Sequence, residues 1–320
     1  MNKQTKDTNF ELMYHKTVLI NEVLEYLNPQ PHKLYCDVTF GSGGHTKAIL
    51  EKEPLCKVVA LDWDATSIET YAPALEEQYH DRLMLLWGNF AHLYRILKKA
   101  GVTKVDGILA DFGTSQMHLK ERAGFSFYRD SPLDMRMSPA HQQITAEQVI
   151  NKSSEEKLCE LFWQLGQETH AKKIAQAILE ARQKKKITTT RELALLIEKV
   201  VPRKMRGAKI HPATKVFQAL RMYVNQELNN IHGFLSGALQ VLQPGGLLLC
   251  ISFHSLEDRV VKQFFKDRSE EGILEIVTKR VVVATPEEIA QNPSSRSAKL
   301  RVARFVGFGT KKEEKNTQEI

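Results

Sequence analysis

Two alternating patterns of apolar residues run along the first third of the chain. Short segments that are apolar at almost every position indicate buried strands, and segments with apolar residues three and four positions apart indicate amphipathic helices. The strands are predicted at residues 33–39, 56–64, 83–90 and 105–113, and the helices at residues 15–27, 45–53, 66–79 and 91–101. This alternation predicts an α/β fold with a mostly parallel sheet and right-handed crossovers.

The alternation stops after residue 113. Long helical patterns fill residues 126–213 with no strand between them, so an inserted all-helical unit is expected there. Beyond it we expect one long helix, a buried strand, a further helix and a terminal antiparallel pair of strands, at residues 211–242, 244–253, 255–267, 274–282 and 299–307. The chain would then comprise a discontinuous α/β domain of residues 1–125 and 214–320, interrupted by a helical domain of residues 126–213.

Composition is that of a soluble globular protein, with 42% hydrophobic and 26% charged residues. A chain of 320 residues exceeds one typical core, which favours two domains. It has no run of eighteen apolar residues and no apolar segment at its polar N-terminus, so we expect neither a membrane span nor a signal peptide. The four cysteines are scattered without metal-ligand spacing, which argues against a zinc site and a disulfide framework. We therefore expect a cytoplasmic protein with no metal.

The charge is concentrated in one segment. The chain carries a net charge of +7, whereas residues 182–216 alone contain eleven Lys or Arg and two Glu, a net charge of +9. Such a block can be a solvated surface or a surface that faces the phosphates of a nucleic acid, and the charge alone leaves both alternatives open.

A glycine-rich loop, TFGSGGH at residues 39–45, follows the first predicted strand. A dinucleotide-binding fingerprint would need glycine at position 46, which is Thr46, and the P-loop pattern is absent. Asp62 ends the next strand, and its carboxylate matches the two hydroxyls of a ribose. A nucleoside joined to an amino acid without a pyrophosphate, S-adenosylmethionine, fits this combination. The alternative is a glycine-rich turn that binds nothing.

Two further strand ends carry candidate residues. Phe90 follows the third strand and could lie against an adenine ring, or it could simply pack in the core. Asp111 ends the fourth strand and is followed by small residues, which leave room for a substrate. Since ligands of such sheets bind at the carboxyl ends of the strands, these positions predict a site at that edge.

Seven segments together resemble the MraW/RsmH family, from residue 15 to about residue 306. They are HKTVLINEVLEYL, DVTFGSGGHTKAIL, LDWD, GFSFYRDSPLDMRM, HPATKVFQALRMYVNQEL, PGGLLLCISFHSLEDRVVK and NPSSRSAKLRVARF. The family consists of bacterial methyltransferases that modify N4 of a cytosine in the decoding centre of 16S ribosomal RNA. The resemblance implies a Rossmann-like class I methyltransferase, 16S rRNA as partner, most simply within the small ribosomal subunit, and a helical insertion that helps to bind it. Neither DNA nor a membrane is expected as a partner.

The resemblance also implies the residues that contact S-adenosylmethionine. These are Gly43, Gly44, His45, Asp62, Phe90 and Asp111. The family has a cofactor-contacting Gln where this chain has His118, and an imidazole there would make the contact sensitive to pH near 6 to 7, a rough window from the ordinary histidine pKa.

Roles in the reaction follow as hypotheses. Asp111, or backbone carbonyls after it, could accept a hydrogen bond from the cytosine amine, and Phe125, Phe127 or Tyr128 could stack on the base or only staple the insertion. His254 could accept a proton, orient RNA or cap the following helix. Four basic residues could neutralise RNA phosphates: Lys184, Arg203, Lys204 and Arg206. A DNA methyltransferase and a non-catalytic RNA-binding factor remain as alternatives, and the missing third glycine disfavours a dehydrogenase.

Overall fold

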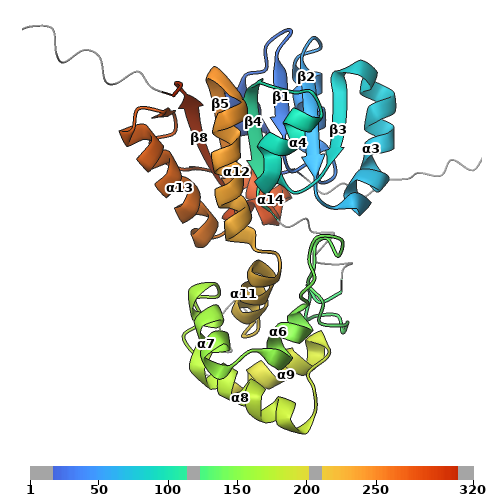
Figure 1. The fold of residues 1–320 in the computed structure, drawn as a ribbon, viewed down its shortest axis with the longest axis vertical. Coiled ribbons are helices and arrows are strands. Elements are labelled where there is room, and N and C mark those ends of the chain that lie inside the picture. Colours follow the sequence, from blue (N-terminus) through green and yellow to red (C-terminus); the bar gives the residue numbers. More distant parts are fainter. Residues whose placement is uncertain (1–16, 114–122, 202–210, 309–320) are drawn as a thin grey trace, which may run out of the picture.

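The computed structural model describes residues 17–113, 123–201 and 211–308. An eight-stranded sheet forms its centre, in the order β3-β2-β1-β4-β5-β8-β6, with β7 paired to β8 (Figure 1). The strands are β1 Leu34–Asp37, β2 Lys57–Asp62, β3 Leu83–Trp87, β4 Val105–Asp111, β5 Leu242–Ser252, β6 Leu274–Ile276, β7 Val282–Val283 and β8 Lys299–Phe305. Strands β1 to β5 run parallel, whereas β8 is antiparallel to β5, β6 and β7. This confirms the Rossmann-like α/β fold and the terminal antiparallel pairing.

Helices cover both faces of the sheet because successive strand residues point to opposite faces. Cys36 packs with one face's hydrophobic cluster and its neighbour Tyr35 with the other. The first cluster contains residues of α4 Leu93–Lys99, α12 Glu227–Val241 and α13 Ser255–Glu270. The second contains residues of α1 Ile20–Leu27, α2 Gly44–Lys52 and α3 Ala65–Tyr79, and Ile289 of α14 Pro286–Gln291 packs against it. Short 3-10 turns follow at η1 His80–Arg82, η2 Phe90–His92 and η3 Pro293–Ser297.

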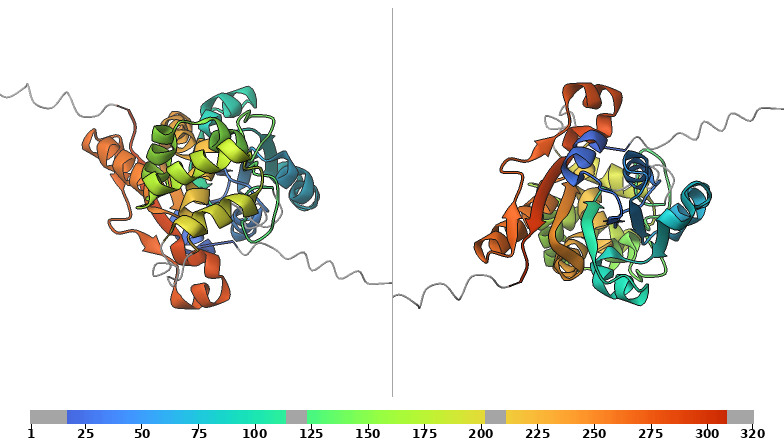
Figure 2. Two further views of the ribbon diagram at one scale, coloured as in Figure 1. Left: turned by 90° about the horizontal axis from the view of Figure 1, so that it is seen from below. Right: turned by 90° about the horizontal axis from the view of Figure 1, so that it is seen from above.

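A separate helical unit lies at the carboxyl edge of the parallel strands (Figures 1 and 2). It contains α6 Ala146–Lys152, α7 Glu155–Gln164, α8 Ala171–Lys184 and α9 Thr190–Val200, which share one hydrophobic cluster. Helix α11, Thr214–Val224, belongs to the same cluster. The two-domain division stays a prediction, and this packing favours a boundary after α11 rather than at residue 213.

The single long helix expected over residues 211–242 is wrong. The structure has α11 and α12 instead, separated at Asn225 and Gln226, where Gln226 adopts a left-handed conformation with φ of 50°. The break arises because the side chain of Asn225 bonds the backbone of the insertion. Its Oδ1 accepts the N–H of Met137, and its Nδ2 donates to the carbonyl of Met135, each at 2.8 Å. The apolar pattern continues through the break and therefore conceals it.

The single strand expected over residues 274–282 is also wrong, because the structure has only the short strands β6 and β7 at the two ends of that range. Other expected elements are present with shifted ends. The first helix begins at Ile20, the third strand ends at Trp87 rather than residue 90, and the fifth strand begins at Leu242 rather than residue 244. Within the ranges described here, no helix combines the length and the hydropathy that crossing a membrane requires.

Candidate active site

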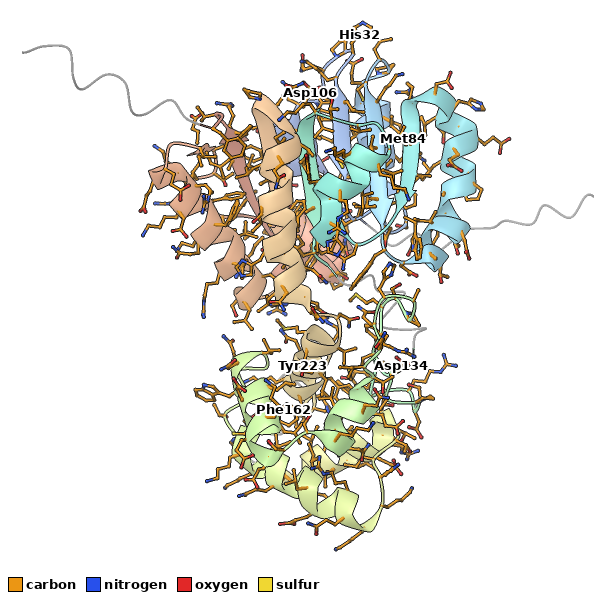
Figure 3. The ribbon with its side chains drawn as sticks, in the orientation of Figure 1. His32, Met84, Asp106, Asp134, Phe162 and Tyr223 are labelled. Carbon is orange, nitrogen blue, oxygen red and sulfur yellow. The ribbon has the colours of Figure 1, made fainter. Side chains whose placement is uncertain are left out.

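Three neighbouring parallel strands each end in an aspartate at the edge that faces the helical unit. Asp37 ends β1, Asp62 ends β2 and Asp111 ends β4, and β1 lies between the other two. Asp106 lies on the same strand as Asp111 but at the opposite edge of the sheet, far from the helical unit (Figure 3). The ligand-binding edge of the fold is therefore marked by three carboxylates.

The carboxylate of Asp62 is held by the glycine loop. Its Oδ2 accepts the N–H of Gly41 at 2.7 Å, and its Oδ1 accepts the N–H of Asp64 at 2.8 Å. Gly41 reaches this position with φ of +55°, a conformation that glycine adopts without strain. A carboxylate has about four acceptor sites on its two oxygens, which is the chemistry that the two hydroxyls of a ribose require. The backbone thus fixes the orientation of the Asp62 carboxylate, and its contact with a ribose stays a prediction.

Glycines at positions 43 and 44 are required by packing within the protein. A Cβ atom on Gly43 would lie 2.3 Å from Cδ1 of Leu75, and one on Gly44 would lie 1.8 Å from Oγ1 of Thr17. Gly43 also has φ of +80° and precedes α2, whose N-terminus has no side-chain cap. The absence of a side chain at these two glycines therefore first of all allows Leu75 and Thr17 to pack against the loop. Their contact with a cofactor stays a prediction.

Asp37 connects the loop to the sheet from within the core. It is completely buried, and it accepts hydrogen bonds from the hydroxyl of Thr46 at 2.7 Å and the N–H of Thr39 at 3.1 Å. Burial raises the pKa of Asp37, against the opposing influence of His45 and these hydrogen bonds. The hydroxyl oxygen of Thr39 in turn accepts the N–H of Asp111 at 2.7 Å. These bonds fix the loop relative to the end of β4.

His45 is a buried imidazole that points to Asp111. Its side chain is 5% exposed, and its Nε2 lies 3.7 Å from Oδ2 of Asp111, beyond hydrogen-bond distance. Neither ring nitrogen forms a hydrogen bond with any residue that the structure describes. Oδ1 of Asp111 accepts the N–H of Gly113 at 3.1 Å. Since buried polar atoms are rarely unpaired, the imidazole fits a polar ligand at this edge, such as the amino-acid end of S-adenosylmethionine.

Phe90 takes part in an aromatic cluster at the third strand end. Its ring centroid lies 5.9 Å from those of Phe112 and Phe234 and 6.4 Å from that of Trp63. The ring is only partly buried, so one side packs in the core while some of its surface remains accessible. Core packing is thus present, and it leaves adenine contact as a further role to be tested.

A pocket of about 500 Å³ opens beside Asp111, between the sheet edge and the helical unit. Its lining comprises Asp111, Phe112 and Gly113; Phe125, Ser126, Phe127, Tyr128 and Met135; Thr214, Phe217, Gln218 and Arg221 of α11; Phe253, His254 and Glu257; and Ser294 and Ser297. The α11 residues lie three and four positions apart, so they form one face of that helix. The sheet, the insertion and α11 thus all contribute to this pocket.

The three expected aromatic residues differ in exposure within this pocket. Phe125 is buried, whereas the side chain of Tyr128 is 84% exposed. Phe127 stacks on His211 with ring centroids 4.4 Å apart and meets Phe217 edge-on at 5.1 Å. All three rings line the pocket, and Tyr128 also lies against Phe127, with ring centroids 4.7 Å apart. Phe127 combines partial burial with ring contacts on two sides, from His211 and Phe217.

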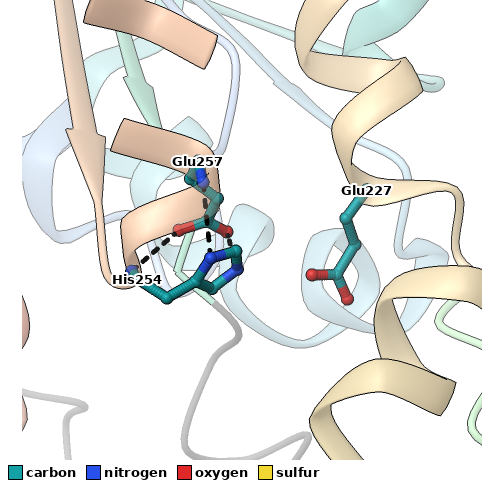
Figure 4. A group of neighbouring side chains, drawn as sticks. All are labelled: Glu227, His254 and Glu257. Carbon is teal, nitrogen blue, oxygen red and sulfur yellow. Dashed lines mark hydrogen bonds and ion pairs between the residues drawn. The ribbon is translucent and has the colours of Figure 1, made fainter. Parts of the chain in front are cut away.

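His254 precedes α13 as its N-cap and is held by Glu257 (Figure 4). Its Nδ1 accepts the N–H of Glu257 at 3.3 Å, and Oε2 of Glu257 accepts the N–H groups of Phe253 at 2.8 Å and His254 at 3.3 Å. The helix-capping alternative for His254 is therefore realised. Because Nδ1 is an acceptor here, the neutral ring carries its proton on Nε2, which lies 3.1 Å from Oε1 of Glu257. Nε2 itself forms no hydrogen bond with a described residue.

Residues 12–306 match the sequence family described as "MraW methylase family". The chain belongs to the MraW methylase family. A protein named "Ribosomal RNA small subunit methyltransferase H" from Sulfurihydrogenibium sp. (strain YO3AOP1) is 42% identical over 295 residues, which is 92% of this chain and all of that protein. The protein of the same name from Thermomicrobium roseum is 44% identical, covering 91% of this chain and 94% of its own length. Solved structures are less similar. The crystal structure of TrmN from Thermus thermophilus aligns with a TM-score of 0.42 and 14% sequence identity, over 90% of this chain and 48% of the TrmN chain.

As a member of the MraW methylase family, the protein is an S-adenosylmethionine-dependent methyltransferase. The residues predicted to contact the cofactor, apart from His118, lie at the carboxyl edge of the sheet or just after it, and Asp111 also borders the pocket. His118, Arg203, Lys204 and Arg206 lie outside the described residues. Lys184 is exposed at the end of α8 and does not line the pocket.

Several residues of this MraW methylase site were missed by sequence reasoning. Asp37 ends a buried strand just as Asp62 and Asp111 do, so the same strand-end rule would have found it. Arg221 pairs with Glu227 through two hydrogen bonds of 2.8 and 3.0 Å. That pair joins two helices which the sequence presents as one, and only the break at Asn225 brings the two side chains together.

Proposed function

We propose that this enzyme transfers a methyl group to the exocyclic N4 of a cytosine in the decoding centre of 16S ribosomal RNA. The observation that carries the proposal is the position of Asp111, which belongs to the cofactor edge and also borders an aromatic-lined pocket large enough for a base. The names of the relatives from Sulfurihydrogenibium and Thermomicrobium support ribosomal RNA as the substrate. A cytoplasmic location, inferred from the scattered cysteines, belongs to the same proposal.

In this reaction the protein mainly has to position the two reactants and to stabilise the charge that develops between them. S-adenosylmethionine, when bound, supplies an electrophilic methyl group. We assign its ribose to Asp62 and its amino-acid end to the loop at Gly43, Gly44 and His45, with Phe90 beside the adenine. The N4 lone pair of cytosine is delocalised into the ring, so the amine is a poor nucleophile. The carboxylate of Asp111 accepts an N4–H hydrogen bond, which localises that lone pair and stabilises the positive charge that develops on nitrogen. Because the methylated nitrogen must lose one proton, the same carboxylate is placed to accept it.

The pocket determines how the base is presented. A base inside a helix cannot reach Asp111, so the target nucleotide must be unstacked from its neighbours. Phe127 offers a ring whose orientation is already fixed, and stacking on an aromatic ring suits a single extruded base. The helical unit would hold the surrounding RNA, with Lys184 and the basic residues beyond α9 contacting phosphates. Methyl transfer should then weaken as salt rises.

The test compares two aspartates on one strand. Asp111→Asn keeps the size of the side chain but removes the carboxylate, and we expect methyl transfer to small ribosomal subunits to fall about 100-fold or more. Asp106→Asn, at the opposite edge of the same strand, serves as the control and should keep full activity. Calorimetry with S-adenosylmethionine separates loss of cofactor binding from loss of transfer. Unchanged transfer by Asp111→Asn would contradict the assigned role.

Substrate class is tested with isotope-labelled cofactor. The purified enzyme is incubated with small ribosomal subunits, free 16S RNA or duplex DNA. We expect label in the ribosomal RNA and none in DNA. Label in DNA would favour the alternative of a DNA methyltransferase, and cofactor binding without transfer to any of the three would favour a non-catalytic RNA-binding factor.

A further inference from the structure

We propose that Arg221 reads the target base by donating hydrogen bonds to N3 and O2 of cytosine. The inference deepens the proposed function and rests on it, since it concerns the base whose N4 amine lies at Asp111. Arg221 is the last pocket residue on the lining face of α11, after Thr214, Phe217 and Gln218. It provides a fixed cationic donor in a pocket whose other polar side chains are the carboxylates of Asp111 and Glu257, the amide of Gln218, the imidazole of His254 and several hydroxyl groups.

The guanidinium group is held in one orientation. Its Nε and Nη2 donate to the two carboxylate oxygens of Glu227 at 2.8 and 3.0 Å, and the two side chains are 17% and 10% exposed. Two parallel hydrogen bonds fix the plane of the guanidinium. Burial alone would lower the pKa of Arg221, but Glu227 and, more weakly, Glu257 raise it, so the group stays charged. The third nitrogen, Nη1, forms no hydrogen bond with any residue in the described ranges.

The acidic cluster of Glu227, His254 and Glu257 beside Arg221 is better suited to the guanidinium than to a metal ion. Ligand atoms of Glu227, His254 and Glu257 lie within 4.8 Å of one another, close enough for a common cation (Figure 4). However, Arg221 already engages both oxygens of Glu227, and a cation between the carboxylates would face the guanidinium. The Nδ1 atom of His254 and the Oε2 atom of Glu257 also accept backbone N–H groups. The positive charge that this cluster needs is thus supplied by Arg221.

The hydrogen-bond donors and acceptors in the pocket are complementary to the Watson–Crick edge of cytosine and not to that of uracil. Cytosine offers a donor at N4 and acceptors at N3 and O2, so it needs an acceptor at one end and donors along the rest of that edge. Asp111 supplies the acceptor. One N–H of Nη1 and the second N–H of Nη2, which point the same way at the end of the guanidinium and have no partner among the described residues, supply the two donors. Uracil has an N3–H and an O4 acceptor, which would set donor against donor and acceptor against acceptor. A site built in this way rejects the wrong base because its buried polar groups would stay unpaired.

The experiment replaces one atom of the substrate and one residue of the enzyme. Small subunits are reconstituted with 16S RNA whose target nucleotide is cytidine or 3-deazacytidine, in which C–H replaces N3. Single-turnover methyl transfer is then measured for wild type and for Arg221→Lys, which keeps the charge beside Glu227 but lacks the planar group. We expect each change alone to slow transfer about tenfold or more, the size of one base contact. We expect Arg221→Lys to transfer to 3-deazacytidine no more slowly than it transfers to cytidine, because the variant has already lost the contact with N3.

Arg136→Lys is the matched control. Arg136 forms the same paired hydrogen bonds with Asp134, at 2.7 and 2.9 Å, but does not line the pocket. Arg136→Lys should leave the ratio of the transfer rates with cytidine and 3-deazacytidine unchanged from wild type. Thermal unfolding is measured for each variant. Because each enzyme is judged by its rate with cytidine divided by its rate with 3-deazacytidine, and compared with the same ratio for wild type, the test stays valid even if Arg221→Lys is less stable.

The inference is overturned if Arg221→Lys slows both substrates by the same factor, because a purely structural role would do that, or if it transfers as fast as wild type. Failure of the proposed function is visible separately. In that case wild-type enzyme would bind S-adenosylmethionine, and nucleoside mass spectrometry would find no N4-methylcytidine in subunits that contain ordinary cytidine.

Discussion

Asn225 is one of the residues that join the two parts of the molecule, and its truncation to alanine tests the fold. The side chain is 1% exposed and makes three hydrogen bonds: it accepts the N–H of Met137 and donates to the carbonyls of Met135 and Arg221. Its own carbonyl accepts from Asn230, whose side chain accepts from Asn89 after β3. This chain of bonds runs from the sheet to the insertion.

The expected cost follows from the bonds that are lost. Each hydrogen bond contributes about 1 kcal/mol net, and a buried group left without a partner costs about 1–3 kcal/mol. Met135 and Met137 are both buried, so water does not readily replace the amide. We therefore expect Asn225→Ala to lower the free energy of unfolding by about 2–4 kcal/mol. Urea unfolding is followed by circular dichroism and by tryptophan fluorescence, since Trp63 packs against the insertion's cluster.

Asn151→Ala is the matched control for this prediction. Asn151 also makes three hydrogen bonds, with Glu147 and Ile187, but all of them lie within the helical unit. Both variants should be less stable than wild type, whereas methyl transfer at a temperature where both are folded should fall only for Asn225→Ala. A loss of less than about 1 kcal/mol for Asn225→Ala, or an equal loss of transfer in both variants, would refute the reasoning.

Three further predictions concern the cofactor loop and the insertion. Gly44→Ala should destabilise the protein by about 1–3 kcal/mol, since its Cβ would overlap Thr17, while Gly237→Ala, where space exists in α12, should be neutral or slightly stabilising in the same thermal unfolding assay. Asp62→Asn should weaken S-adenosylmethionine binding about tenfold or more in calorimetry, because a carboxylate is a stronger acceptor for hydroxyls than an amide; an unchanged Kd would remove Asp62 from the site. A hydrogen bond from Lys185, aided by the N–H of Thr188, lowers the pKa of Glu192 to about 2. Its stabilising contribution is therefore full above the unfolded pKa of about 4.3 and disappears as the pH falls toward 2, so the stability difference between wild type and Glu192→Gln should shrink between pH 5 and pH 2. A difference that is constant with pH would contradict this assignment.

The sequence predicts the sheet unit well because its patterns are local. Buried strands are continuous apolar runs, and an aspartate at the end of such a run is visible without knowing the fold. Strand order is less accessible, yet the parallel β1 to β5 follow from the strand–helix alternation. The loop at residues 39–45 could be placed correctly, although packing against Thr17 and Leu75, which requires glycine at positions 43 and 44, could not be foreseen.

The site between the two units is hidden from the sequence for a physical reason. Arg221 and Glu227 are six positions apart, which places them on different sides of one continuous helix. They meet only because Gln226 turns the chain and Asn225 binds the insertion. His254 illustrates the reverse: its position just before a helix allowed both a capping and a catalytic role, and only the hydrogen bond at Nδ1 shows the cap.

The central claim is that this enzyme methylates N4 of one cytosine in small-subunit ribosomal RNA. Small subunits from cells that lack the gene are incubated with the purified enzyme and S-adenosylmethionine carrying a deuterated methyl group, and the RNA is digested and mapped by mass spectrometry. We expect deuterated N4-methylcytidine at a single position in the decoding centre, and we expect none when Asp111→Asn replaces the wild-type enzyme. Label on another nucleoside, or no label in the RNA although the enzyme binds the cofactor, would contradict it.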